Sequence, residues 1–242
     1  MLESILALPP ERPPRVLCLG AHSDDIEIGA AATLARLLAA RPDVEMRWTV
    51  FTASPERAAE TRAAALALGG GRIRVECERF RDGSLPADLG PLKARFEALK
   101  SFEPDLVVTH HGRDAHQDHR AIAGLTASTW RSHSVLEYEI PKYDGDLGNP
   151  AVFVPLSPEE AAAKAALLVE HFASQRRRPW FDESTFMALM RLRGVQCAAP
   201  GGYAEAFHAP KQRLGFAPPG ARAQTISSSG IGNTSRPPQP RT

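Results

Sequence analysis

The chain has 242 residues, 43% of them hydrophobic and 24% charged, values typical of a soluble globular protein that can bury a sizeable core. Its 29 basic and 28 acidic residues leave a formal net charge of +1, which excludes a broad electrostatic surface for nucleic acid or an anionic membrane. Three cysteines favour a reducing compartment, so we expect a cytoplasmic protein. No apolar run is long enough for a membrane-spanning helix, and the first residues lack the basic segment of a signal peptide.

The positive sign of the net charge comes from the end of the chain. Residues 217–242 contain three arginines and no acidic residue, and they are rich in Pro, Gly and Ser. Such a segment buries too little apolar surface to become ordered by itself. We therefore expect residues 217–242 to form a disordered tail.

Short apolar runs alternate with helical stretches over the first 140 residues. The apolar run at 16–19 predicts a strand that ends at Gly20, and leucines on one face predict a helix over 26–40 that Pro42 ends. The same patterns predict, in chain order, a strand over 44–50, a helix over 56–68 followed by three glycines, a strand over 73–77, a helix over 89–99, a strand over 106–109, a helix over 119–131 and a strand over 135–140.

The chain beyond Pro141 is first turn-rich and then returns to regular patterns. It predicts a short strand over 152–154, a helix from Ser157 to about 172, a helix over 183–193 and an edge strand over 203–207. Alternating strands and helices favour βαβ units with a mostly parallel sheet. We predict an α/β, Rossmann-like three-layer αβα fold with a C-terminal elaboration. It would form one domain over 1–216, with a core at about 15–140 and a C-terminal half at about 141–216.

Two clusters of polar residues each follow a predicted strand directly. GAHSDDIE covers 20–27, and HHGRDAHQDH covers 110–119. In a doubly wound sheet of order 3-2-1-4-5, the two preceding strands are neighbours where the winding reverses, and ligands bind in the crevice at that point. The topology alone would therefore bring the two clusters together.

The residue types in these clusters favour a metal site. One Asp and two His can supply the three protein ligands of a catalytic Zn²⁺, with the fourth position left for water or substrate. Adjacent Asp24 and Asp25 could instead cap a helix, and the histidines could lie in a solvated loop, but their joint occurrence at two strand ends favours the metal. A dinucleotide loop is disfavoured because G-x-G-x-x-G is absent and two carboxylates would repel a pyrophosphate.

The motifs resemble those of a known family. AHSDDIE at 21–27 is similar to the A-H-P-D-D-x-E signature of the LmbE-like, or PIG-L, zinc deacetylases, and HQDH at 116–119 resembles their H-x-D-H signature. The segments RAAETR, DGSL and PDLVVT, at 57–62, 82–85 and 104–109, resemble further motifs of the family. The resemblance covers about residues 15–132. It implies a Rossmann-like fold and zinc-dependent hydrolysis of an N-acetyl or other N-acyl group on an amino sugar or glycoconjugate.

The resemblance also implies individual roles. The ligands of Zn²⁺, or of another divalent metal, would be His22, Asp25 and His119. Asp24 would be the general base that activates water. His116 would stabilise the oxyanion or protonate the departing amine, and Asp118 would orient His116.

Substrate contacts are implied more weakly. Arg62 and Asp82 match family positions near the sugar, although Arg62 could instead form a surface salt bridge. Ser23 stands where the family usually has Pro, so we expect a change in turn rigidity, with a substrate contact as the alternative.

Two further groups of residues have roles that the sequence leaves open. Arg176–Arg178 could face an anionic aglycone or be a solvated charge run, and Tyr138, Tyr143 and Trp180 could stack on a sugar or serve packing.

These patterns predict a small-molecule amino-sugar or glycoconjugate substrate and no nucleic-acid partner. One alternative is a related zinc amidase that cleaves a bulkier thiol-conjugate amide, a choice that the C-terminal half would decide. Another is a non-catalytic, sugar-binding relative. Retention of the metal-ligand pattern together with Asp24 argues against it, because binding alone does not need a base beside a metal.

Overall fold

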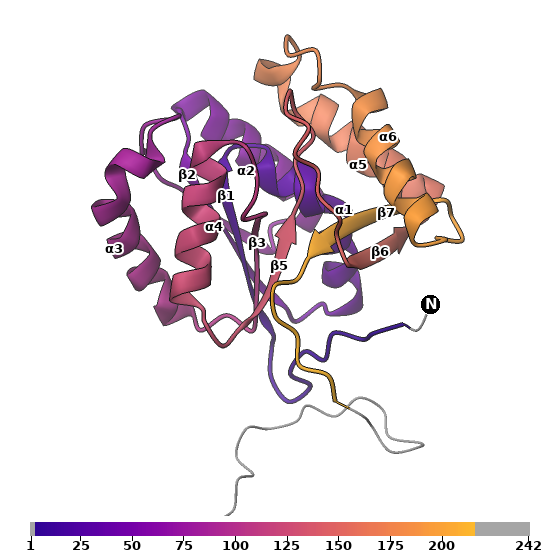
Figure 1. Ribbon diagram of the computed structural model, residues 1–242, viewed down its shortest axis with the longest axis horizontal. Helices are drawn as coiled ribbons and strands as arrows, with labels where there is room; N and C mark the ends of the chain where they lie inside the picture. The colour runs from indigo at the N-terminus through magenta and orange to yellow at the C-terminus, as the bar shows by residue number, and fades with distance from the viewer. Residues whose placement is uncertain (1–2, 216–242) are drawn as a thin grey trace, which may run out of the picture.

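The computed structural model describes residues 3–215, which are built around a seven-stranded sheet (Figure 1). The strands are β1 (Arg15–His22), β2 (Glu45–Thr52), β3 (Ile73–Cys77), β4 (Leu106–His110), β5 (Ser134–Tyr138), β6 (Val152–Leu156) and β7 (Tyr203–His208). Their order across the sheet is β3-β2-β1-β4-β5-β7-β6. The first five strands in this order are parallel, whereas β7 is antiparallel to both of its neighbours.

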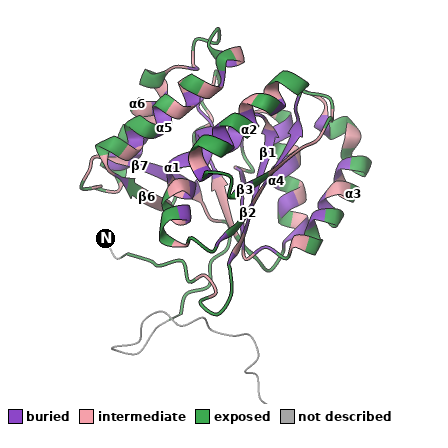
Figure 2. Ribbon diagram, turned by 180° about the vertical axis from the view of Figure 1, so that it is seen from behind, coloured by how far each residue is buried: buried purple, intermediate pink, exposed green. Residues whose placement is uncertain are grey.

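Helices cover both faces of the sheet. One face carries α1 (Asp25–Ala40), α2 (Pro55–Gly69), α5 (Pro158–His171) and α6 (Glu183–Gln196), and the other carries α3 (Leu89–Leu99) and α4 (Gln117–Thr129). Because side chains alternate along a strand, Val16 and Cys18 of β1 enter the first core while Leu17 and Leu19 enter the second. Figure 2 shows the buried residues concentrated on the strands between the two helical layers.

The predicted fold class is confirmed. The sheet is mostly parallel, helices lie on both of its sides, and the predicted order 3-2-1-4-5 is found within it. Within residues 3–215, no helix combines the length and hydropathy that crossing a bilayer requires. The tail expected at 217–242 lies outside the described residues, so its disorder and the domain boundary at 216 stay predictions.

The end of β1 and the start of α4 differ slightly from the predicted elements. β1 continues past Gly20 to His22 because its end still pairs with β2, where His22 lies opposite Thr52. α4 begins at Gln117, two residues earlier than expected, because the His116 side chain accepts a hydrogen bond from the backbone N–H of Asp118 at 3.2 Å. Both shifts place polar residues of the motifs at fixed ends of regular elements.

The expectation of an edge strand over 203–207 is wrong in its position. β7 lies between β5 and β6, and β6 is the edge strand. The charged residue within β7, Glu205, is buried rather than solvated. Its carboxylate accepts hydrogen bonds from the backbone N–H groups of Ala32 and Thr33 in α1 and from Lys164 of α5, at 3.0, 2.7 and 2.6 Å. Glu205 therefore ties the C-terminal part of the sheet to the helix that follows β1.

Replacement of Glu205 with alanine is expected to lower the free energy of unfolding by about 3–5 kcal/mol, because it leaves the buried charge of Lys164 without a partner. Urea denaturation would show this as a lower midpoint at an unchanged slope. Replacing the pair together, as Glu205→Leu with Lys164→Met, should recover much of the loss. The exposed Glu170 of α5 provides the control, and a loss no larger than that of Glu170→Ala would contradict the assigned role.

Candidate active site

The turn between β1 and α1 places two carboxylates at the carboxyl end of the sheet. His22 is the last residue of β1 and Asp25 is the first of α1. Asp24 between them has φ of 99°, in the left-handed region that Asp and Asn adopt more readily than other residues with a side chain. His22, Asp24 and Asp25 all line one cavity of about 590 Å³, together with His116 and His119.

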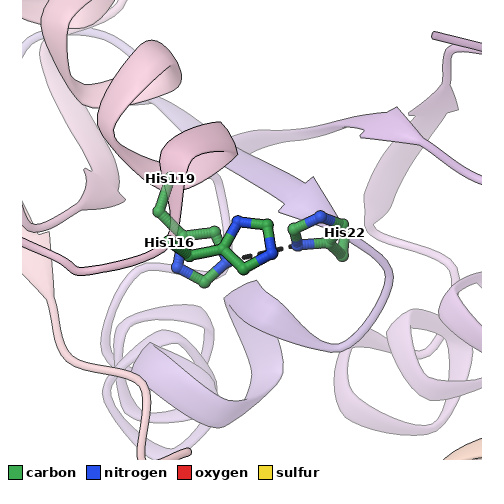
Figure 3. Close-up of side chains that lie close together, drawn as sticks. All are labelled: His22, His116 and His119. Carbon is green, nitrogen blue, oxygen red and sulfur yellow. Dashed lines mark hydrogen bonds between the residues drawn. The ribbon is translucent and has the colours of Figure 1, made fainter. Parts of the chain in front are cut away.

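His22, Asp25 and His119 converge on one point. His22 Nδ1 lies 3.1 Å from His119 Nε2, and the Asp25 carboxylate lies 3.3 Å from the first nitrogen and 3.5 Å from the second. Zn²⁺ binds its ligands at about 2.0–2.2 Å, so tetrahedral ligands lie about 3.4 Å from one another. Figure 3 shows His22 facing the imidazoles of His116 and His119 across this space. The three predicted ligands therefore fit a divalent metal ion.

The acidic surroundings of His119 also favour a cation. His119 Nε2 faces Asp25, and its Nδ1 lies 2.9 Å from the carboxylate of Asp114. Burial lowers the pKa of His119, but Asp25 and Asp114 outweigh burial and raise that pKa to about 9. In turn, burial would raise the pKa of Asp25, but His119, His110 and His22 hold it well below the usual value. An ionised carboxylate is the form that binds a metal.

Asp114 and Lys142 form a support behind His119. Asp114 accepts a hydrogen bond from the backbone N–H of His116 at 2.7 Å and lies 3.0 Å from Lys142 Nζ. Lys142 also contacts Asp146 at 2.5 Å. A carboxylate on the far nitrogen of a metal-binding imidazole fixes the orientation of the ring. Sequence reasoning missed this role, although Asp114 is part of the second polar cluster.

Asp24 is a buried carboxylate that faces the cavity. Burial is the largest influence on its pKa and raises it to about 6, while Arg57 opposes the increase. Arg57 Nη2 lies 3.0 Å from Asp24 Oδ1, and the same guanidinium binds Ser174 Oγ at 3.0 Å and the carbonyl of Ser23. A carboxylate whose pKa is near neutrality, and whose orientation is fixed, meets the requirements of a general base.

Arg57 was not among the predicted site residues. It lies on the first turn of α2, which Ser54 caps, and its position within RAAETR is the signal in the sequence that could have identified it. Glu60 of the same motif contacts Arg57 at 3.6 Å and accepts a hydrogen bond from Ser174 Oγ at 2.7 Å. The motif therefore links α2 to the C-terminal half and fixes the arginine beside Asp24.

One ring nitrogen of His116, Nδ1, accepts a backbone hydrogen bond, and the ring lies beside His22 and His119. Its ring centroid lies 4.7 Å from those of His22 and His119. Because Nδ1 accepts the backbone N–H of Asp118, the proton of the neutral ring resides on Nε2. Burial, followed by the charges of His119 and His22, lowers the pKa of His116. A neutral imidazole with a protonated Nε2 is suited to donate a hydrogen bond, although the ring nitrogens of His22, His116 and His119 also lie close enough together to hold a metal ion.

The carboxylate of Asp118 lies elsewhere than the predicted role requires. It accepts hydrogen bonds from the backbone N–H groups of Gly83 and Leu85, at 2.7 and 3.0 Å, and lies 3.3 Å from His22 Nε2. It therefore orients His22 and the loop after β3, and only its backbone contacts His116.

The three predicted substrate contacts have different positions. Asp82 is exposed, lines the cavity and lies 3.1 Å from His22 Nε2. Ser23 is fully buried outside the cavity lining, and its Oγ has no hydrogen-bond partner among residues 3–215. Arg62 is exposed on α2, bonds the carbonyl of Ala58 and does not line the cavity. The structure brings only Asp82 to the site.

Of the aromatic residues with open roles, Trp180 lines the cavity. Tyr138 is fully buried and donates to the carbonyl of Leu19 at 2.7 Å, which is a packing role. Tyr143 is exposed and packs edge-on against Trp180. Arg178, the last of the three consecutive arginines, also lines the cavity.

The fold and the site define a class: an α/β enzyme with a His and Asp cluster for a divalent metal at the switch point of its sheet. Residues 17–130 match the family described as PIG-L, GlcNAc-PI de-N-acetylase, which confirms the resemblance seen in the motifs. An Escherichia coli (strain K12) protein named "Uncharacterized deacetylase YaiS" is 28% identical over 190 residues, which cover 71% of this chain and 97% of that protein. The prediction of an enzyme of the deacetylase class is thereby confirmed.

Solved structures share the fold. The 4-carboxy-2-hydroxymuconate hydratase GalB from Pseudomonas putida KT2440 is 19% identical with a TM-score of 0.68, covering 84% of this chain and 99% of its own. The N,N′-diacetylchitobiose deacetylase from Pyrococcus horikoshii, complexed with an inhibitor, is 19% identical with a TM-score of 0.64, covering 83% and 85%. Identities this low establish a common architecture and leave the reaction to be argued from the residues of the site.

Proposed function

We propose that this chain is a metal-dependent N-deacetylase that hydrolyses the N-acetyl, or another N-acyl, group of an amino-sugar or glycoconjugate substrate in the cytoplasm. The observation that carries the proposal is the position of Asp24, a buried carboxylate in the same cavity as the converging His22, Asp25 and His119. A site that only bound sugar would gain nothing from a base beside three metal ligands.

The metal is proposed to be Zn²⁺, held by His22 Nδ1, His119 Nε2 and the Asp25 carboxylate. When bound there, it would polarise the acyl carbonyl and lower the pKa of water at the site. Asp24 accepts the proton of the attacking water, and Arg57 holds the Asp24 carboxylate in place. Asp114 and Asp118 orient the rings of His119 and His22 through their second nitrogens.

His116, which also lines the cavity, is proposed to stabilise the acyl oxygen. Its protonated Nε2 donates to the carbonyl oxygen as negative charge develops there. The C–N bond then breaks, and the proton that Asp24 accepted passes to the departing amine. Acetate and a free amino group are the products.

His116→Ala is expected to reduce kcat by about 10²–10³-fold, the usual effect of removing one donor to an oxyanion. Metal content should be unchanged, because the assigned ligands remain. Amine release and metal content would be measured on the same preparation. His111→Ala is the matched control, since His111 bonds Glu137 and does not line the cavity. Loss of the metal from His116→Ala would instead make His116 a ligand.

The cavity suits a sugar with an attached group. Its volume of about 590 Å³ lies within the range of small-molecule sites, and Trp180 offers an aromatic face on which a sugar ring can stack. Asp82 on the rim is proposed to bind a sugar hydroxyl. The same site could hydrolyse the amide of a bulkier thiol conjugate, which remains the alternative activity. Arg62 and Ser23 do not line the cavity, so we do not include them among the proposed substrate contacts.

The proposal is tested by metal content together with amine release. Purified protein would be assayed with free, nucleotide-linked, lipid-linked and thiol-conjugated N-acyl amino sugars. Release of an amine from one class, lost on chelation and restored by Zn²⁺, is the expected result. Hydrolysis of thiol conjugates alone would select the amidase alternative. If none of these substrates releases an amine from metal-loaded protein, the proposed function is wrong.

A further inference from the structure

His110, the last residue of β4, is a fully buried imidazole to which the proposed reaction assigns no role. Its ring stacks on that of His119, with centroids 3.9 Å apart and an angle of 17° between the planes. Its Nε2 lies 3.1 Å from Asp25 Oδ2. His110 therefore contacts two of the three proposed metal ligands, although it does not line the cavity.

The same nitrogen completes the backbone hydrogen bonding of β1. The pairing of β1 with β4 ends at Cys18 and Val108, whereas β1 continues beside β2 as far as His22. Beyond the end of the β4 pairing, the buried N–H of Ala21 donates to a side chain, His110 Nε2, at 2.9 Å. Because a buried backbone donor requires a partner, the imidazole takes the place of a strand at this point. It bridges β1 and β4 at the carboxyl end of the sheet, where the site lies.

A histidine at this position also has a cost. His110 Nδ1 is buried and has no hydrogen-bond partner among residues 3–215. An unpaired polar atom in the core lowers stability, and an aliphatic side chain would avoid that loss. The contacts of Nε2 must therefore supply something that an aliphatic side chain cannot.

One possible role is that of a metal ligand, because Asp25, His110 and His119 offer atoms close enough together to hold an ion. Two observations argue against it. The lone pair of His110 Nε2 is already occupied, since it accepts the N–H of Ala21. This group is also buried throughout, whereas His22 lines the cavity in which a substrate would bind. The geometry favours a residue that lies behind the ligands.

We propose that His110 is a positioning residue of the metal site, which holds Asp25 and His119 at the spacing that a divalent cation requires. This inference rests on the proposed function and adds a residue to its metal site. Nε2 anchors the end of β1 through Ala21, which adjoins the third ligand, His22. The same nitrogen borders Asp25, and the face of the ring restricts rotation of His119. Residues that orient metal ligands raise the affinity for the metal without contacting it.

Titration of the metal-free proteins with Zn²⁺ tests this role without reference to catalysis, and Co²⁺ absorption spectra report the ligand set. His110→Phe keeps an aromatic ring but removes the Nε2 acceptor, and we expect its Zn²⁺ affinity to be about 10–100-fold weaker than that of the parent. His110→Gln places an amide oxygen near the position of Nε2 and should recover most of the affinity, with the Co²⁺ spectrum of the parent. If His110→Phe does not fold, His110→Asn takes its place, because the shorter amide does not reach Ala21.

Tyr138→Phe is the matched control. Tyr138 is equally buried, pairs with His110 in the sheet, and donates to the carbonyl of Leu19 in β1 at 2.7 Å. Its replacement also removes a buried hydrogen bond to β1, but it leaves the contacts of Asp25 and His119 with the imidazole in place. Thermal unfolding of the metal-free proteins should show a loss of stability in both variants, whereas Zn²⁺ affinity should fall only in His110→Phe.

The outcomes separate this inference from the proposed function. Parent affinity in His110→Phe, or an equal loss of affinity in Tyr138→Phe, would make His110 a packing residue and overturn the proposal. Binding as weak in His110→Gln as in His110→Phe, with altered Co²⁺ spectra in both, would make His110 a ligand and would also overturn it. If the metal-loaded protein releases no amine, the proposed function fails, and the order of Zn²⁺ affinities still decides the role of His110. A parent protein that binds no divalent ion overturns both.

Discussion

Asp24→Asn is expected to reduce kcat by about 10²–10⁴-fold while the protein keeps its metal, because an amide cannot accept the proton that the carboxylate removes from water. The exchange isolates this effect for two reasons. Asparagine has the size of aspartate, and it tolerates the left-handed backbone at this position, where φ is 99°. Asp25, the adjacent residue that we propose as a metal ligand, is left unchanged.

The measurement would combine kcat, metal content and thermal stability for the same preparations. Glu60→Gln is a suitable comparison, because Glu60 also contacts Arg57 but does not line the cavity. It should change activity far less than Asp24→Asn does. If Asp24→Asn retained the full rate with metal in place, another group would have to be the base.

The fold was predictable where the information is local. Periods of two and of 3.6 residues marked β1 to β5 and their helices, and these five strands have the order 3-2-1-4-5 of a doubly wound sheet. The position of β7 was not predictable in this way. Pairing between distant strands leaves no signal in a six-residue pattern. A glutamate in that pattern also indicates a solvated position, and only the packing of α1 and α5 shows that Glu205 is buried.

The residues of the site were likewise predictable only where the topology of the sheet determines their position. His22 and His119 belong to clusters at the carboxyl ends of β1 and β4, so the topology was sufficient to bring them together. Lys142 comes from a turn-rich loop after β5, and its approach to Asp114 depends on how that loop packs. Asp118 shows a further limit, since a motif specifies the residue but not which neighbouring histidine its carboxylate contacts.

His119→Ala is expected to remove most of the bound metal at equilibrium, and with it the activity, because it leaves only His22 and Asp25 of the three proposed ligands. A smaller change should have a graded effect. Asp114→Asn keeps all three ligands but weakens the carboxylate support on His119 Nδ1, 2.9 Å away, and the loss of such a partner typically weakens metal affinity about 10–100-fold. The order of affinities, parent above Asp114→Asn above His119→Ala, is the specific expectation.

Titration of the metal-free proteins with Zn²⁺ would measure these affinities without reference to catalysis. His133→Ala is the control, because His133 is exposed, immediately precedes β5 and does not line the cavity. An unchanged affinity in His119→Ala would make the assignment of the ligands wrong. If Asp114→Asn alone kept the parent affinity, Asp114 and Lys142 would support the loop rather than the metal. The two substitutions therefore test the ligand and its support separately, in a cluster where several imidazoles and carboxylates lie close enough to replace one another.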